Sequence, residues 1–314
     1  MTSSDKIHIV FACDDNYAQH AGVAIVSLRE QQKSGLPVHV HLLDGGISPV
    51  NLERLRELKD RHLEISIYKG NMEEYSQYLI STYISKAAYL RLSIEKLLPQ
   101  EMNKIIYCDC DLIFMQPVDD LWNIDLKTHW LAAALDLNNQ CRNDLGIDDL
   151  HQYFNSGVML IDLKAWRTWR ICEKVKDYLE SNWEKIRYWD QDGLNAILYK
   201  DWLPLDKGWN THTTDLIDKK LPPPHIIHFA SELKPWFYKS LDPFQGEYIK
   251  YLRLSPWHDY KFPDKNIFVW VYRKILLCIP WSVFRVVSIF TWRLRNFVKE
   301  LDRQIALKRL NRNQ

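Results

Sequence analysis

Two carboxylates, Asp109 and Asp111, follow an apolar run in the segment IIYCDCDLIF, with one residue between them. Carboxylates this close repel each other unless a cation lies between them, so this D-x-D pattern indicates a bound Mg²⁺ or Mn²⁺. A second apolar run, in HIIHFASELKPW, ends with His228, and Lys234 follows six residues later. One imidazole and two carboxylates form a reasonable Mn²⁺ ligand set, beside which Lys234 would be a point charge for diphosphate oxygens. The ordinary alternatives are two solvated acids in a loop and a histidine satisfied within the core.

A third polar group, Asp14, Asp15 and Asn16, follows the first apolar run in FACDDNY. The chain has only ten glycines and no G-x-G, which excludes a dinucleotide-binding fingerprint and a P-loop. Carboxylate and amide groups at this position could instead bind the base and ribose of a nucleotide. From this stretch alone, an Asx-rich turn is the preferred interpretation.

The elements that would hold these groups alternate between strand and helix. In the first half of the chain, short β-branched runs alternate with longer segments of helical period, which predicts an α/β domain with a mostly parallel sheet flanked by helices. Ligands bind beyond the carboxyl ends of strands in such sheets. Ser48 and Pro49 are expected to begin the second helix as its N-cap and first residue. The expected strands are 7–12, 38–44, 63–69, 103–111, 130–136, 157–162 and 225–230, and the expected helices are 21–28, 49–62, 87–98, 163–183 and 191–199.

The charge of the chain is unevenly distributed. The 314 residues include 41 Lys and Arg against 40 Asp and Glu, a formal net charge of +1. Residues 265–314 contain eleven basic and two acidic residues, a net charge of +9, so residues 1–264 carry −8. This asymmetry predicts a mildly acidic body over residues 1–262 and a separate basic, aromatic-rich segment over residues 263–314.

The basic segment has the pattern of an amphipathic helix. After Pro280, apolar residues recur at spacings of three and four and form one stripe. The density of Trp, Phe and Arg favours a helix that lies in the interface of an anionic membrane, and so many Ile, Val and Leu residues suit lipid better than nucleic acid. The alternative is a terminal helix docked on its own core. No apolar run reaches the ~20 residues needed to cross a bilayer.

The remaining sequence features favour a cytoplasmic protein. The first residues lack the charged and apolar regions of a secretory signal. The six cysteines are scattered, which is typical neither of a disulfide framework nor of a zinc site. Together with the basic segment, these features predict a peripheral protein on the inner face of the cytoplasmic membrane.

Five segments in this order, FACDDNY, YCDCD, YFNSGVMLIDLKAWR, WDQDGLN and HFASELKPW, resemble glycosyltransferase family 8 over residues 7–236. The likeness is strongest to bacterial lipooligosaccharide galactosyltransferases and their glucosyltransferase relatives. The resemblance implies a Rossmann-like GT-A fold, a UDP-galactose or UDP-glucose donor, Mn²⁺ or Mg²⁺, and retention of anomeric configuration. It also implies a glycolipid or oligosaccharide acceptor belonging to lipopolysaccharide, lipooligosaccharide or another surface glycan.

The resemblance also implies roles for particular residues. Those near uridine would be Ala12, Asp14 and Asn16, and the metal ligands would be Asp109, Asp111 and His228. Other donor-binding positions would be Arg91, Asp109, Cys110, Asp136, Asn155, Ser231 and Lys234, with Lys234 on the diphosphate and Ser231 where the galactosyltransferases have glycine. Asp190 and Gln191 would lie beneath the reactive carbon. The ordinary alternatives are a surface helix charge for Arg91, a turn residue for Asn155 and a helix N-cap for Asp190. Acceptor contacts are expected in 138–152 and 210–219.

The residues near the reactive carbon determine the expected mechanism. A retaining enzyme would normally use a carboxylate nucleophile, whereas the best-placed residue, Gln191, is a poorly nucleophilic amide. We therefore expect front-face attack by the acceptor hydroxyl, with the departing phosphate taking the proton. In this scheme the metal and Lys234 stabilise the leaving diphosphate, Gln191 stabilises the oxocarbenium-like state and Asp190 orients the donor sugar.

Three other functions compete with this one. Haloacid-dehalogenase-like phosphotransferases also carry a D-x-D, but on the first strand of their core, whereas here it follows three expected strands. A catalytically degenerate, membrane-binding protein would associate with lipid without hydrolysing a UDP-sugar. A self-glucosylating priming protein would add sugar to its own chain.

Overall fold

The computed structural model describes residues 6–78, 86–137, 142–148, 150–213, 215, 222–230 and 234–278. The chain divides into two units. The first contains Met1–Trp236 and Asp242–Lys261, and the second contains Phe237–Leu241 and the residues from Phe262 onward.

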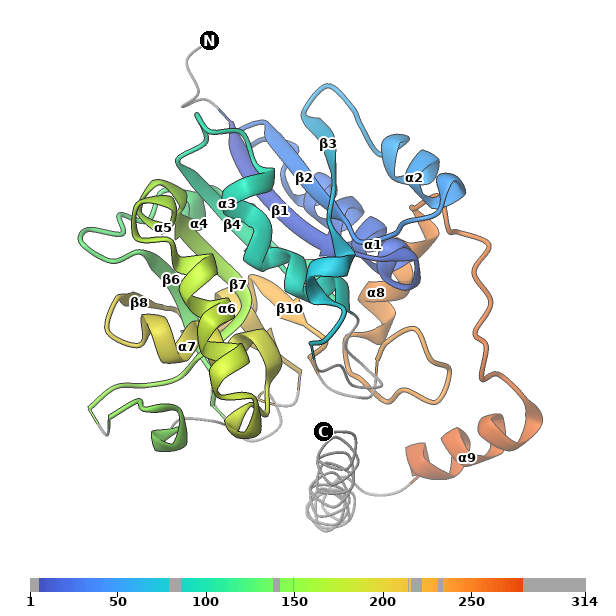
Figure 1. The fold of residues 1–314 in the computed structure, drawn as a ribbon. Coiled ribbons are helices and arrows are strands. Elements are labelled where there is room, and N and C mark those ends of the chain that lie inside the picture. Colours follow the sequence, from blue (N-terminus) through green and yellow to red (C-terminus); the bar gives the residue numbers. More distant parts are fainter. Residues whose placement is uncertain are drawn as a thin grey trace. The chain divides into compact units, whose positions relative to one another are not determined.

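A seven-stranded sheet of order β3-β2-β1-β4-β7-β6-β8 forms the centre of the first unit (Figure 1). Strands β3, β2, β1 and β4 are parallel, as are β6 and β8, whereas β7 runs antiparallel to both of its neighbours. The expected mostly parallel sheet is therefore confirmed. Its strands are β1 (Ile7–Cys13), β2 (Val38–Asp44), β3 (Leu63–Lys69), β4 (Lys104–Cys108), β6 (Leu131–Leu135), β7 (Phe154–Asp162) and β8 (Trp202–Leu205).

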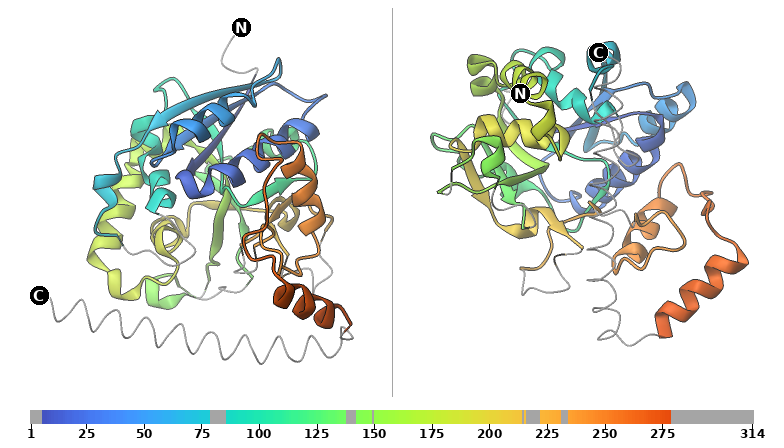
Figure 2. Two further views of the ribbon diagram at one scale, coloured as in Figure 1. Left: turned by 90° about the vertical axis from the view of Figure 1, so that its right-hand side faces the viewer. Right: turned by 60° about the horizontal axis from the view of Figure 1, so that its bottom comes forward.

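Helices pack on both faces of this sheet, and Figure 2 shows α6 and α8 on opposite sides of it. On one side, side chains from η2, α5, α6 and α7 share a core with alternate strand residues such as Val10, Tyr107 and Met159. On the other side, α1 and α8 are joined by a 2.7 Å hydrogen bond between His20 Nδ1 and the Tyr248 hydroxyl. The helices are α1 (Asp15–Gln31), the 3₁₀ helix η2 (Lys86–Ser93), α5 (Leu163–Trp169), α6 (Ile171–Ser181), α7 (Trp189–Leu198) and α8 (Gln245–Arg253).

Three helix predictions differ from the structure. Helix α2 (Pro49–Arg56) begins as predicted, with the Ser48 side chain accepting from the Asn51 amide, but it ends before His62. The segment 87–98 is mostly the 3₁₀ helix η2, followed by one turn, α3 (Ile94–Leu97). The segment 163–183 is broken after Trp169, because Arg170 adopts a left-handed conformation with φ of 52° that no continuous α-helix contains.

A second, three-stranded sheet of order β5-β10-β9 adjoins the D-x-D loop. Strand β10 confirms the strand expected at 225–230, but it is shorter and lies outside the main sheet. Its pairing with β5 is antiparallel and places His228 opposite Leu112, immediately after Asp111. The members of this sheet are β5 (Leu112–Phe114), β9 (Thr211–His212) and β10 (Ile226–His228). Short elements complete the unit: η1 (Met72–Tyr75), α4 (Asp119–Trp122), η3 (Asn143–Leu145), η4 (Trp183–Lys185) and η5 (Lys207–Asn210).

The second unit contains helix α9 (Ile267–Cys278). Asp264 accepts hydrogen bonds from the backbone amides of Tyr238 and Lys239, and the Arg273 guanidinium donates to the Tyr238 carbonyl. Several large apolar side chains of α9 are exposed, among them Ile267 (64%) and Phe268 (82%). Within the described residues, no helix is both long and apolar enough to span a membrane. The amphipathic helix expected after Pro280 lies outside the described residues.

Candidate active site

The D-x-D carboxylates lie close to His228, between the end of β4 and the start of β5 and beside the end of β10. Asp109 follows β4 and its amide donates to the Gly157 carbonyl of β7 (2.8 Å), while Asp111 leads into β5 and its carbonyl accepts from the Phe229 amide (2.8 Å). His228 Nε2 lies 3.2 Å from Asp111 Oδ1 and 3.8 Å from Asp109 Oδ2. One ligand atom from each of these three residues lies within 4.8 Å of the other two. The predicted metal ligands are therefore neighbours.

A chain of hydrogen bonds orients the imidazole ring of His228. The Gly157 amide donates to Asn155 Oδ1 (3.0 Å), which also accepts from Asn210 Nδ2 (2.7 Å). Asn210 Oδ1 therefore faces His228 Nδ1 (2.9 Å) as an acceptor, and this arrangement assigns the proton to Nδ1. The other nitrogen, Nε2, is left as an electron-pair donor facing two carboxylates. Such a donor set, with its histidine held from behind, fits a divalent cation.

Two buried cations flank this group. Arg91 Nη2 lies 2.6 Å from Asp109 Oδ1, and Lys234 Nζ lies 2.6 Å from Asp111 Oδ2. Burial would raise the pKa of Asp111, but the charges and hydrogen bonds of Lys234 and His228 together outweigh burial and hold that pKa below its usual range. Arg91 is 4% exposed, so the interpretation of this residue as a surface charge is wrong. Each carboxylate of the D-x-D is therefore paired with a buried cation.

Asp190 is a buried carboxylate next to Arg91. Arg91 Nε lies 2.6 Å from Asp190 Oδ2, but it donates its hydrogen to the Ala88 carbonyl (3.3 Å). Among the described residues, Asp190 Oδ2 consequently has charge contact but no hydrogen-bond donor. Burial raises the pKa of Asp190 to about 6, although the Arg91 charge opposes this rise. Asp190 is not an N-cap, because α7 starts before it and Tyr188 occupies the cap position.

Gln191 is the centre of a second group of contacts. Its Oε1 accepts from Asn155 Nδ2 and from the Ser156 amide, both at 3.0 Å. Its Nε2 donates to Asp136 Oδ2 (3.1 Å) and to the Tyr153 hydroxyl (3.2 Å). Three predicted site residues therefore meet here, and Asn155 lies in strand β7 instead of a turn. Because Asn155 also contacts Asn210, this group is continuous with the one that holds His228.

The residues predicted to bind uridine lie at the end of β1. The side chain of Asp14 caps α1 by accepting from the Tyr17 amide (3.2 Å), and Asp15 accepts from the Ser48 amide (2.8 Å). The segment is therefore the start of a helix, with Asp14 as the N-cap and Asp15 and Asn16 as the first helical residues, instead of the Asx-rich turn considered from the sequence. Asn16 is exposed. Cys110 Sγ donates to the Ala12 carbonyl (3.3 Å), which ties the D-x-D loop to the end of β1. Ser231 lies outside the described residues.

Several residues that the sequence did not single out are part of this network. Asn210 is fully buried behind His228, although the stretch 210–219 was expected to contact the acceptor. Arg142, in the other expected acceptor stretch, is buried and donates to Asp192 Oδ1 (2.7 Å). Asp192 also accepts from the Tyr153 hydroxyl (2.7 Å). Only the shared WDQD motif could have pointed to Asp192, and nothing in the local pattern marks Asn210.

Comparison with known proteins identifies relatives over most of the chain. The model of glycosyl transferase family 8 matches residues 8–240. General stress protein A of Bacillus subtilis is 33% identical over 285 residues, which cover 85% of this chain and all of that protein. Lipopolysaccharide 1,2-glucosyltransferase of Escherichia coli K12 is 26% identical over 275 residues, covering 82% and 81% of the two chains.

Solved structures give a consistent result. The crystal structure of galactosyltransferase LgtC with donor and acceptor sugar analogs matches with a TM-score of 0.74 and 25% identity, covering 80% of this chain and 96% of that one. Another structure of LgtC, with the same TM-score, identity and coverage, is of an active-site mutant in which glutamate replaces a glutamine. The GT-A fold expected from the sequence is confirmed.

Proposed function

Since this chain belongs to glycosyl transferase family 8 and is a glycosyltransferase, we propose that it transfers a hexose from a UDP-sugar, with a divalent metal, to a saccharide of a cell-surface glycan. Family membership excludes the haloacid-dehalogenase-like alternative. The observation that carries the proposal is the meeting of Asp109, Asp111 and His228 beside the buried cations Arg91 and Lys234. Galactose or glucose as the hexose, and a lipopolysaccharide-type acceptor, are supported by the galactosyltransferase and lipopolysaccharide glucosyltransferase relatives.

Asp109, Asp111 and His228 would hold the cation, for which we propose Mn²⁺. When bound, it would supply positive charge that stabilises the diphosphate as it leaves. Lys234 Nζ also donates to the Phe229 carbonyl (2.7 Å), a contact that would hold its ammonium group if Asp111 bound a metal. Lys234 would then direct its charge to the diphosphate. Arg91 pairs with both Asp109 and Asp190. It therefore connects the proposed metal ligands with the residues proposed to contact the donor sugar.

Gln191 and Asp190 would act on the donor sugar. Gln191 Oε1 already accepts two N–H hydrogen bonds, which draw electron density from it and make it a still poorer nucleophile. This arrangement favours front-face attack by the acceptor hydroxyl, with the proton passing to the departing phosphate. The carbonyl dipole of Gln191 would stabilise positive charge on the sugar ring. Among the residues that the structure describes, none donates to the buried Asp190 Oδ2, which would accept from a sugar hydroxyl.

We further propose that residues 1–262 are the catalytic domain and that residues 263–314 attach it to an anionic membrane, on the cytoplasmic face. Two observations support this attachment. The segment from residue 265 has a net charge of +9, and α9 exposes Ile267, Phe268, Trp270 and Val271. Basic residues beside exposed apolar and aromatic side chains are typical of interfacial helices. A lipid-linked glycan acceptor would be presented at the same surface.

A donor screen tests the proposed reaction. Purified full-length protein with Mn²⁺ is incubated with UDP-galactose, UDP-glucose and UDP-N-acetylglucosamine, and the slow release of UDP is measured. We expect one hexose donor to be hydrolysed in a metal-dependent way, and NMR of the acceptor product to show the donor's anomeric configuration retained. Lipid association without hydrolysis would instead identify a degenerate enzyme, and label on the protein itself would identify a self-glucosylating one.

Removing one metal ligand tests the role of the D-x-D. Asp109→Asn should abolish metal-dependent UDP binding in isothermal titration calorimetry, since one charged ligand of the cation is lost. Asp120→Asn, which removes an exposed carboxylate outside the site, is the matched control and should bind as the parent does. Normal UDP affinity of the parent in EDTA would contradict the metal site.

A further inference from the structure

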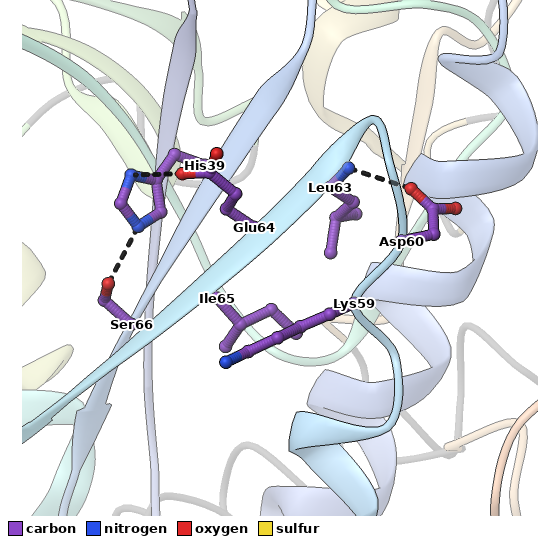
Figure 3. Close-up of a pocket in the computed structure, with 7 residues that line it drawn as sticks. All are labelled: His39, Lys59, Asp60, Leu63, Glu64, Ile65 and Ser66. Carbon is purple, nitrogen blue, oxygen red and sulfur yellow. Dashed lines mark hydrogen bonds and ion pairs between the residues drawn. The ribbon is translucent and has the colours of Figure 1, made fainter.

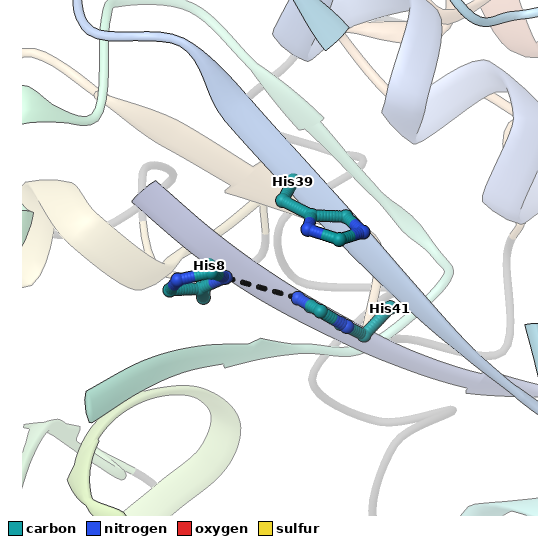
Figure 4. Close-up of side chains that lie close together, drawn as sticks. All are labelled: His8, His39 and His41. Carbon is teal, nitrogen blue, oxygen red and sulfur yellow. Dashed lines mark hydrogen bonds between the residues drawn. The ribbon is translucent and has the colours of Figure 1, made fainter. Parts of the chain in front are cut away.

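Three histidines lie together at the end of the sheet opposite to the candidate active site. His8 and His39 are direct neighbours in the parallel pairing of β1 with β2, and His41 lies two residues further along β2. Because side chains alternate along a strand, all three imidazoles project from the same face (Figure 4). His8 and His39 are the second residues of their strands and His41 is in the middle of β2, whereas the D-x-D follows the carboxyl end of β4.

The ring nitrogens are close enough to share one ion. One nitrogen from each imidazole lies within 4.8 Å of the other two. His8 Nδ1 and His41 Nε2 are 3.0 Å apart. Two nitrogens bound to one tetrahedral zinc ion are separated by about 3.3 Å, given Zn–N bonds of about 2.05 Å. A shift of a few tenths of an ångström would therefore convert this hydrogen-bonded pair into a pair of metal ligands.

Contacts behind the rings hold two of them in position. His41 Nδ1 lies 3.1 Å from the Tyr68 hydroxyl, and His39 Nε2 lies 2.8 Å from Ser66 Oγ. Metal-binding histidines usually hold their second nitrogen on a protein group in this way, which fixes the tautomer. The contacts leave Nε2 of His41 and Nδ1 of His39 to serve as electron-pair donors.

Burial disfavours the charged form of all three imidazoles. Burial, and then the neighbouring His39, lower the pKa of His8 to about 4. Burial, and then the two neighbouring imidazoles, hold the pKa of His41 far below its usual value, and burial lowers the pKa of His39.

A carboxylate and a pocket lie beside His39. Glu64 Oε2 lies 3.7 Å from His39 Nδ1, and its side chain is 56% exposed. His39, Glu64 and Ser66 line a pocket on β3 (Figure 3). The other residues that line it are Lys59, Asp60, Leu63 and Ile65. An ion could enter from this pocket, and Glu64 or a water molecule could complete four-fold coordination.

We propose that His8, His39 and His41 form a second metal site, which takes a transition-metal ion of the zinc class. Neutral imidazole suits Zn²⁺, Ni²⁺ and Cu²⁺, whereas the carboxylate-rich D-x-D group suits Mn²⁺ and Mg²⁺, so the two sites select different ions. The bound ion would join β1 to β2. It would therefore stabilise the folded sheet away from the candidate active site.

Cobalt is the probe, because Co²⁺ at nitrogen-rich tetrahedral sites absorbs visible light strongly, unlike Co²⁺ at oxygen-rich octahedral sites. Full-length protein purified without a polyhistidine tag is titrated with Co²⁺ in the absence of nucleotide. We expect one equivalent of tetrahedral Co²⁺, which Zn²⁺ displaces. Asp109→Asn should keep this signal, whereas His39→Gln should weaken Zn²⁺ binding at least about tenfold and remove the thermal shift that Zn²⁺ produces.

His258→Gln is the matched control, because His258 is exposed and outside the cluster. His8→Asn provides a second variant, and each variant is compared with the parent by circular dichroism before titration. The proposal is overturned if the parent gives no tetrahedral signal, or if Asp109→Asn removes that signal. Parent-like Zn²⁺ affinity in either folded cluster variant would overturn it as well.

Discussion

At the scale of the residue, Gln191 links the donor-sugar positions to one another. Replacing Gln191 with Ala removes contacts to Asp136, Asn155 and Tyr153 and the dipole beneath the proposed reactive carbon. We expect turnover to fall about 10²- to 10³-fold, the usual cost of losing one preorganised group, with donor affinity nearly intact. Steady-state kinetics and calorimetry with the UDP-sugar measure the two quantities. Gln100→Ala, on the exposed surface, is the control, and retained turnover in Gln191→Ala would exclude the proposed role.

The raised pKa of Asp190 leads to a prediction for the pH dependence of the reaction. Because its pKa in the folded protein is about 6, above the usual value of 3.8, Asp190 becomes protonated as the pH falls through 6. A protonated Asp190 cannot pair with Arg91, so we expect kcat/KM to decline below about pH 6. Mn²⁺ at Asp109 would offset part of the charge that raises this pKa, and the decline would then begin at lower pH. A kcat/KM profile from pH 4.5 to 8 should show this decline in the parent but not in Asp190→Asn.

The raised pKa of Asp190 also affects the free energy of unfolding, which responds to pH in the opposite direction to kcat/KM. Between pH 3.8 and about 6 the folded state holds a proton that the unfolded state has released. The contribution of Asp190 to the free energy of unfolding therefore decreases as the pH rises through this interval. At neutral pH this buried carboxylate costs stability, as functional groups often do.

The sequence predicts which residues have functional chemistry better than it predicts how they are held. The carboxylates, His228 and Gln191 are found through short motifs, because the chemistry of a site limits the residue types at adjacent positions. Asn210 is not, because its partner Asn155 is 55 positions away in the chain. Only folding brings such pairs together.

At the scale of the element, the fit of β7 against β10 determines the position of His228. A Cβ atom on Gly157 would lie 2.3 Å from His228 Cε1 and 2.7 Å from its Nδ1. Gly157→Ala must therefore displace the imidazole, and we expect Mn²⁺ affinity to fall at least tenfold and the free energy of unfolding to fall by about 1–3 kcal/mol. Calorimetric Mn²⁺ titration and urea unfolding measure these changes.

Gly246→Ala is the matched substitution, because no atom lies within 4 Å of the added methyl group. Gly246 lies in α8, where alanine should increase stability by up to about 1 kcal/mol. Parent-like Mn²⁺ binding in Gly157→Ala would show that the histidine can move without loss of the site.

Element types follow from the sequence where the pattern is long and regular. The β-branched runs of β1, β2 and β3 each extend over seven residues and predict their strands closely. Strand β5 has three residues and β9 has two, too few for alternation to be seen, so the second sheet could not be predicted. The break at Arg170 was also missed, because the apolar stripe continues across it while the backbone conformation changes.

At the scale of the whole molecule, the opposite charges of its two parts predict separable behaviour. Deleting residues 265–314 removes a net charge of +9 and should release the protein from vesicles that contain phosphatidylglycerol. UDP-sugar hydrolysis should persist, because the residues of the candidate site precede position 235. Flotation with anionic vesicles, and with phosphatidylcholine vesicles as the control, measures the association. If the truncated protein still floats, the membrane contact lies elsewhere in the chain.

The hydrogen-bond chain behind His228 has one fixed direction. Two backbone amides of β7, those of Ser156 and Gly157, can only donate, and each contacts the oxygen of a side-chain amide. If the side-chain amide of Gln191 or Asn155 were flipped, its NH₂ group would face a backbone N–H. Asn210 is constrained as well, because its NH₂ group donates to Asn155 Oδ1. The tautomer of a candidate metal ligand is thus set by peptide groups that do not titrate. In many metal sites an ionisable carboxylate fixes the tautomer of the histidine ligand, whereas here the backbone of strand β7 does so.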